Sequence, residues 1–155
     1  MKYLIIGSFF LTALHIALAD DLIKQKVEKF SILTPNDFAI KKLSPVEDFD
    51  IYSIGKNGRP YVSIYLGNHP SFPRNSAGTG ETITTFKTDN VQIISIQNNG
   101  KLAKKEILIK LTTQGWPGYI HAWIIDDLTP TDIKMADDIL MSIDTQTLNT
   151  HVKTQ

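Results

Sequence analysis

Residues 49–66 read Phe-Asp-Ile-Tyr-Ser-Ile-Gly-Lys-Asn-Gly-Arg-Pro-Tyr-Val-Ser-Ile-Tyr-Leu, and this stretch decides the fold. Both of its ends are rich in aromatic and β-branched residues, which favour strands. Between them, the Asn57-Gly58 step accepts the positive φ angles that a tight hairpin turn requires. The stretch therefore predicts a β-hairpin.

The second strand of this hairpin has two faces of different chemistry. Side chains alternate along a strand, so one face carries only aliphatic residues, Val62, Ile64 and Leu66. The opposite face carries Tyr61, Ser63 and Tyr65. This alternation is typical of an antiparallel sheet with one face on a core.

Further β-prone runs lie on both sides of the hairpin. Upstream, Phe38 to Leu43 is a candidate strand. Downstream, the candidate strands are Glu81 to Lys87, Val91 to Gln97, Lys105 to Leu111 and Tyr119 to Ile125, with a second turn signal at Asn98-Asn99-Gly100. Residues 22 to 33 instead have the spacing of a short amphipathic helix that runs into a strand at Phe30 to Leu33.

A second helix is predicted after the last strand. Thr129 is a suitable N-cap, Pro130 suits the first helical position, and Asp132 lies in the first turn. The apolar residues that then share one helical face are Ile133, Ala136, Leu140 and Ile143. We therefore predict a single α+β domain with a mainly antiparallel sheet of five to seven strands, covered by this C-terminal helix and by the N-terminal one.

The first 19 residues have the three parts of a cleavable signal peptide. Lys2 gives the positive start, an apolar run of about a dozen residues follows, and Ala17 and Ala19 are the small residues before the cleavage point. We expect cleavage after Ala19, a mature domain over 20–155 with a polar tail from about residue 145, and a periplasmic or secreted location. The chain has no cysteine and no N-glycosylation sequon, which favours a bacterial source.

The charge balance argues against nucleic acid and acidic membrane surfaces as partners. The chain has 16 basic and 16 acidic residues, and without Lys2 the mature protein has 15 and 16. No cofactor motif is found. Three mature histidines, His69, His121 and His151, are too few and too scattered for a metal site, so we expect none. We expect His121 to be hydrogen-bonded in or beside the sheet.

Two short segments resemble a known family. The Phe-Ser-Ile-x-x-Pro pattern at Phe30 to Pro35, and the helix end Ile-Leu-x-Ser-Ile within Ala136 to Ile143, are similar to those of the PsbP/Mog1/DcrB group of small exported α+β proteins. The resemblance covers about twenty residues at the two ends of the domain. It implies an accessory or binding protein without catalysis, and it assigns no functional residue.

Residues 67 to 80 hold two prolines and three glycines without apolar periodicity, which predicts a long loop. Loops of this length commonly carry function, and tyrosines beside one are typical of a recognition surface. The hypothesis is an exported, non-enzymatic binding protein that acts on a protein partner, for example a periplasmic immunity or inhibitor protein. The candidate partner-binding residues are Tyr61, Tyr65, Asn68, His69, Phe72 and Arg74.

The alternative is a small periplasmic hydrolase. His69 would act with Ser71 or Ser76 as nucleophile and with Asp48 or Asp50 as the orienting carboxylate. The Gly-x-Ser-x-Gly pattern of a nucleophile on a sharp turn does not occur, so no catalytic residue is assigned.

Overall fold

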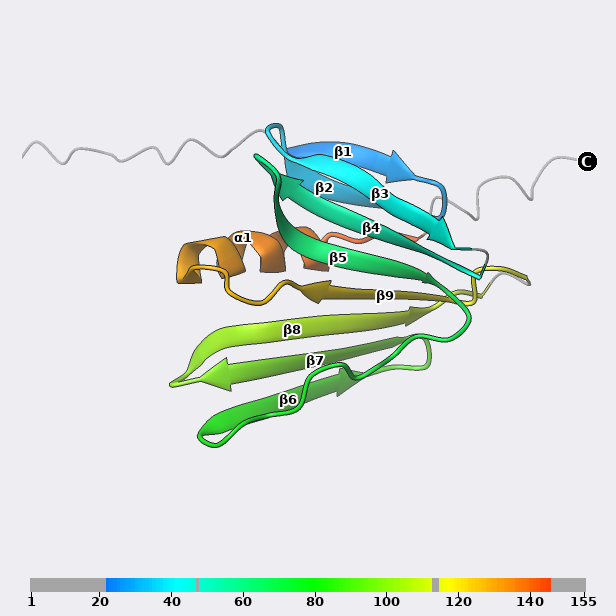
Figure 1. Ribbon diagram of the computed structural model, residues 1–155. Helices are drawn as coiled ribbons and strands as arrows, with labels where there is room; N and C mark the ends of the chain where they lie inside the picture. Colours follow the sequence, from blue (N-terminus) through cyan, green and yellow to red (C-terminus); the bar gives the residue numbers. More distant parts are fainter. Residues whose placement is uncertain (1–21, 47, 113–114, 146–155) are drawn as a thin grey trace, which may run out of the picture.

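The computed structural model describes residues 22–46, 48–112 and 115–145 (Figure 1). A seven-stranded antiparallel sheet has the order β3-β4-β5-β9-β8-β7-β6, and β1 and β2 form a separate two-stranded hairpin. The elements are β1 (Leu22–Val27), β2 (Phe30–Pro35), β3 (Ala39–Val46), β4 (Phe49–Lys56), β5 (Arg59–Gly67), β6 (Glu81–Lys87), β7 (Val91–Asn98), β8 (Lys101–Lys110), β9 (Tyr119–Ile124) and α1 (Pro130–Met141). The α+β class with one antiparallel sheet under a C-terminal helix is confirmed. No helix in these ranges is long and apolar enough to cross a membrane.

The predicted hairpin is confirmed as β4 and β5. Its turn residues Asn57 and Gly58 have φ angles of 51° and 76°, which the type I′ geometry requires of both central residues. Asn99 and Gly100 join β7 to β8 with nearly the same angles, 50° and 73°. Both turns therefore follow directly from local sequence.

One face of the sheet packs on the main core. The predicted helix α1 covers β5, β9 and β8 on this face, and Thr129 caps it by accepting the backbone N–H of Asp132 at 3.2 Å. Ala136, Ile139 and Leu140 are its fully buried residues. The β1–β2 hairpin joins the same core, where Phe30 meets Tyr52 edge to face at 6.0 Å between ring centroids.

The helix predicted over residues 22 to 29 is wrong, because this segment is the strand β1. Each of its residues pairs with β2, from Leu22 opposite Pro35 to Val27 opposite Phe30. Leu22, Ile23 and Val27 are too few to form a buried helical stripe, and Glu28-Lys29 makes a tight turn instead. Tertiary pairing with the strongly buried β2 decides the conformation.

The placement of Tyr61 beside Ser63 and Tyr65 is also wrong. Gly55 pairs with Pro60 while Ile54 pairs with Val62, so Tyr61 is the extra residue of a β-bulge. A Cβ on Gly55 would lie 2.0 Å from the carbonyl oxygen of Arg59, so the bulge needs glycine there. Tyr61 is turned into the main core, is 3% exposed, and donates its hydroxyl to Asp132 at 2.9 Å.

The predicted long loop is confirmed over residues 68–80. It leaves β5 near the middle of the sheet and enters β6 at one edge, so it passes the ends or faces of three intervening strands. Figure 1 shows it turning back at the end of the sheet and running in front of β7 and β6. The second face of the sheet is therefore partly covered by a loop instead of a helix.

Candidate functional site

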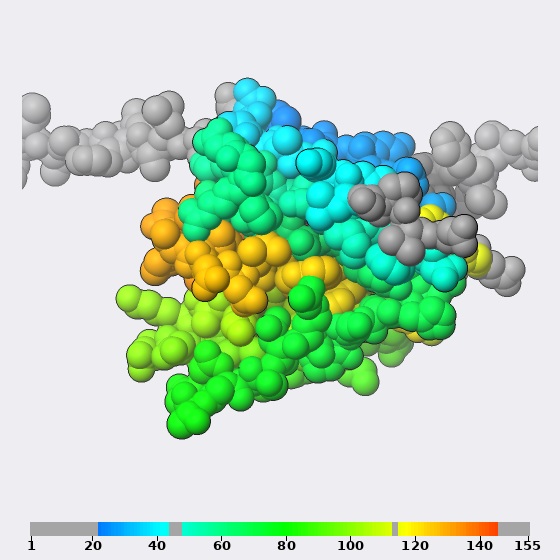
Figure 2. Space-filling model, in the orientation of Figure 1, coloured from blue at the N-terminus to red at the C-terminus, as the bar shows by residue number. Residues whose placement is uncertain are grey.

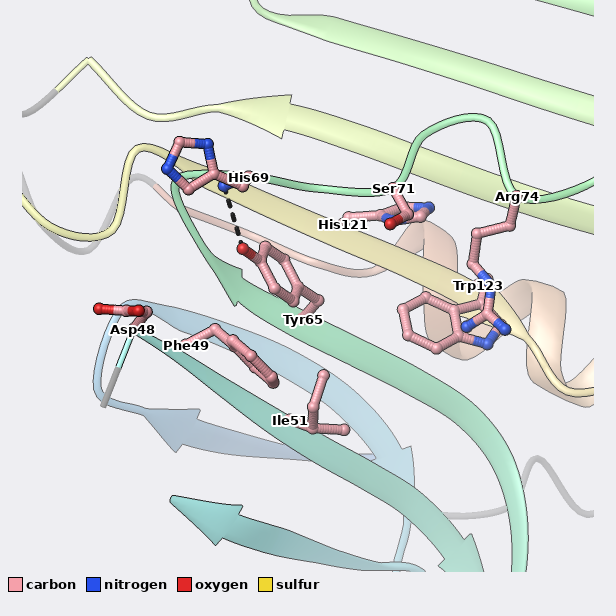
Figure 3. Close-up of a pocket in the computed structure, with 9 residues that line it drawn as sticks. All are labelled: Asp48, Phe49, Ile51, Tyr65, His69, Ser71, Arg74, His121 and Trp123. Carbon is pink, nitrogen blue, oxygen red and sulfur yellow. Dashed lines mark hydrogen bonds between the residues drawn. The ribbon is translucent and has the colours of Figure 1, made fainter. Parts of the chain in front are cut away.

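A cleft of about 570 Å³ opens on the loop-covered face of the sheet (Figure 3). One wall comes from β4 and β5, and the other comes from the loop and β9. At the left of Figure 2, yellow-orange atoms lie between the green atoms of the loop and β6 and the blue-green atoms of the β4–β5 hairpin. The lining residues are Asp48, Phe49, Ile51, Tyr65, His69, Ser71, Arg74, His121 and Trp123.

Strand register brings three of these side chains into one row. Ile51 on β4 pairs with Tyr65 on β5, and Tyr65 pairs with His121 on β9. Because facing residues of paired strands point to the same side of a sheet, all three lie on the cleft face. The neighbouring positions Tyr52, Ile64 and Ala122 lie on the core face.

A buried carboxylate holds the loop to the sheet. Glu106 of β8 is 1% exposed and accepts the backbone N–H groups of Arg74 at 3.0 Å and Asn75 at 3.1 Å. The Nε2–H of His121 donates to the same carboxylate at 2.9 Å. Burial alone would raise the pKa of Glu106, but these three hydrogen bonds hold its pKa below the ordinary value. The ionised carboxylate therefore anchors the loop in a fixed position.

His121 is hydrogen-bonded within the sheet, as predicted, through its contact with Glu106, and two aromatic rings pack against it. Phe72 of the loop meets the imidazole edge to face, with 5.3 Å between the ring centroids. The centroid of the Trp123 ring lies 5.1 Å from that of the imidazole. Phe72 is half-buried by this packing. It therefore holds the loop on the sheet in addition to any role in a partner contact.

Arg74 brings a positive charge to the cleft. Its guanidinium carbon lies 4.0 Å from the centroid of the Trp123 ring, a cation–π geometry (Figure 3). The Arg74 residue is exposed, and it makes no ion pair with any residue in the described ranges. The stacked guanidinium is thus held in place with its hydrogen-bond donors unused by acidic side chains.

The other end of the loop is fixed through Tyr65 and Asn68. The Tyr65 hydroxyl accepts the backbone N–H of His69 at 3.0 Å, and its ring packs on Phe49 at 5.5 Å between centroids. The side-chain oxygen of Asn68 accepts the backbone N–H of Gly118 at 2.8 Å. Both residues therefore shape the entrance of the loop, while His69 itself stays exposed.

The predicted surface residues come together except for Tyr61. Tyr65, His69 and Arg74 line the cleft, and Asn68 and Phe72 secure the loop that forms its wall. Tyr61 lies in the opposite core, so a partner cannot reach it from the cleft. Sequence reasoning missed Glu106 as the anchor. Glu106 follows Lys104 and Lys105 in β8, so it looks like an ordinary exposed charge in the sequence, and its partners are 15 and 32 residues away.

The residues of the hydrolase hypothesis meet only in part. His69, Ser71 and Asp48 line the same cleft, but no hydrogen bond joins their side chains in the part of the chain that the structure describes. Asp50 lies on the other face of β4 and pairs with Lys42 at 2.8 Å. Within the same ranges, no three histidine and acidic residues are grouped to hold a metal ion.

Fold and site together define an α+β protein with a preformed aromatic cleft on the open face of its sheet. No protein-family model matches the chain, and a search of curated proteins gave no match. The resemblance to the PsbP/Mog1/DcrB group stays a prediction.

Proposed function

We propose that this protein is a non-enzymatic binding protein that holds a segment of a protein partner in the cleft between the β4–β5 hairpin and the loop 68–80. The observation that carries the proposal is the fixed loop. The backbone N–H groups of the loop are hydrogen-bonded to a buried, ionised Glu106. The loop therefore forms the cleft wall before any ligand binds. A preformed site loses little conformational entropy on binding.

The cleft chemistry favours a particular kind of segment. Phe49, Tyr65 and Trp123 offer aromatic surface, and Arg74 offers a guanidinium without an acidic partner in the described ranges. Aromatic residues and arginine are the types that dominate binding energy at interfaces. We therefore expect the partner segment to present a carboxylate next to an apolar side chain.

The proposal includes export. The signal-peptide pattern over residues 1–19 lies outside the described residues, and the mature chain would begin at Asp20. A periplasmic or secreted partner follows from this location. A periplasmic immunity or inhibitor protein is one concrete form of the proposal.

A displayed library of random peptides tests the binding function. Peptides selected on the mature protein should carry Asp or Glu beside an aromatic or aliphatic residue. Arg74→Glu should weaken their binding about tenfold or more, which corresponds to about 1.4 kcal/mol, because it replaces the attractive charge by a repulsive one. Titration of a fluorescent peptide measures the change.

Lys101→Glu is the matched control, because it makes the same charge reversal at an exposed turn away from the cleft. Its peptide affinity should equal that of the wild type. Selected peptides that bind both variants equally, or no selected peptide at all, would contradict the proposed cleft.

A further inference from the structure

The two edges of the seven-stranded sheet differ in how they are protected. The edge strand β3 carries Lys41, Lys42 and Pro45, and its pairing register shifts between Leu43 and Val46. Lysines, a proline and an irregular register are the usual means of keeping an edge from pairing. The β3 edge is therefore blocked to another strand.

The opposite edge strand β6 has neither a proline nor a register shift, and its one lysine, Lys87, stands at its end. Glu81–Lys87 pairs with β7 in unbroken register, and it contains no proline. Two of its large apolar residues face solvent, with Ile83 47% exposed and Phe86 57% exposed. An exposed, regular, partly apolar edge is a template for a further strand.

The sequence of β6 is complementary to itself when it runs antiparallel. In the register centred on Thr84, Glu81 of one copy faces Lys87 of the other, and the second such pair follows by symmetry. The Glu81 carboxylate already accepts the Gly78 N–H at 2.7 Å within its own chain, and its remaining acceptor sites are the ones that would face Lys87. The same register sets Ile83 opposite Thr85 on one face and Thr82 opposite Phe86 on the other. Opposite charges directly across a strand pair stabilise it, and like charges destabilise it.

We propose that a second copy of this chain pairs with β6 along its free edge, in antiparallel register with the two-fold axis at Thr84. The pairing joins two seven-stranded sheets into one continuous sheet and covers Ile83 and Phe86 of both copies. Residues of β6 do not line the cleft, so both clefts stay accessible in the dimer. The inference is therefore independent of the proposed binding function.

Single cysteines test the register, since the natural chain has none. At the two-fold axis Thr84→Cys opposes its own copy, with Cβ atoms about 5 Å apart, so a shift of about 1 Å brings them to disulfide distance. Thr82→Cys is the matched control on the same face, and its two copies lie four strand positions apart, about 13 Å. On mild oxidation Thr84→Cys should form covalent dimer about tenfold faster than Thr82→Cys or more. Equal rates would overturn the register.

A charge exchange tests the dimer in solution. Lys87→Glu alone places four acidic residues at the interface, and Glu81→Lys alone places four basic ones. Each variant should sediment as a monomer, and an equimolar mixture should form a heterodimer of wild-type size, because every facing pair between the two variants is opposite in charge. Recovery on mixing also establishes that both variants are folded. A monomeric wild-type protein at its highest soluble concentration, or no dimer on mixing, would overturn the proposal.

Discussion

The two faces of the sheet are covered by different means. On the core face, α1 and the β1–β2 hairpin bury aliphatic and aromatic side chains. On the cleft face, an irregular loop is held mainly by hydrogen bonds to one buried carboxylate, with Phe72 packed beside it. A helix satisfies its own backbone groups, whereas a loop needs partners for them. The position of the loop on the cleft face therefore depends on the negative charge of Glu106.

The largest expected effect is on the core face. Leu140 is fully buried in α1, so Leu140→Ala should lower the free energy of unfolding by about 2–5 kcal/mol, through lost burial and a cavity. Denaturant titration measures this loss. Met141→Ala is the control, because Met141 is an exposed neighbour in the same helix and its loss should be small. Equal losses for the two variants would mean that the helix is not held by its apolar face.

An intermediate effect is expected on the cleft face. Glu106→Gln keeps the side-chain shape but removes the charge that accepts three donors, and should cost about 1–3 kcal/mol. Amide hydrogen exchange should become faster at Arg74 and Asn75, since their N–H groups lose a charged acceptor. Leu140→Ala should not have this local effect. If both variants loosen the loop equally, the two faces are not independent.

The smallest effect is a pH dependence confined to the cleft face. The pKa of Glu106 is lowered in the folded protein, so its contribution to stability is present in full above the ordinary carboxyl pKa of 4.5 and is lost as the pH falls through the lowered value. His121 and the N–H groups of Arg74 and Asn75 are the donors that face it. The difference in unfolding free energy between wild type and Glu106→Gln should shrink below pH 4.5. A constant difference would contradict an ionised anchor.

Local signals in the sequence predicted the elements that local chemistry decides. The Asn57-Gly58 turn, the Thr129 cap and the loop 68–80 all follow from residues near one another in the chain. The predictions were wrong where contacts with other strands or with residues far away in the sequence determine the structure. β1 is a strand because β2 pairs with it, and Tyr61 is buried because a bulge turns it toward Asp132, 71 residues away.

The sequence predicted the loop of the candidate site, but it did not predict that Glu106 anchors this loop. The composition of residues 67 to 80 predicted a long loop, and most of the candidate residues lie on or near the cleft, while their role in binding stays a prediction. The row that joins Ile51, Tyr65 and His121 depends on β5 pairing with β9, more than fifty residues downstream. No local pattern encodes that pairing.

The strand order has a consequence for how the chain reaches this structure. β3, β4 and β5 form one run of successive hairpins, and β6 to β9 form another, so most pairings in the sheet are local in sequence. Only the β5–β9 pairing joins the two runs. Contacts between residues close in sequence form quickly, whereas contacts between distant residues form more slowly because a long loop must first close. Pairings within each half are therefore favoured early, and the β5–β9 seam, crossed by α1 on one side and by the loop on the other, joins the halves into one folding unit with a shared core.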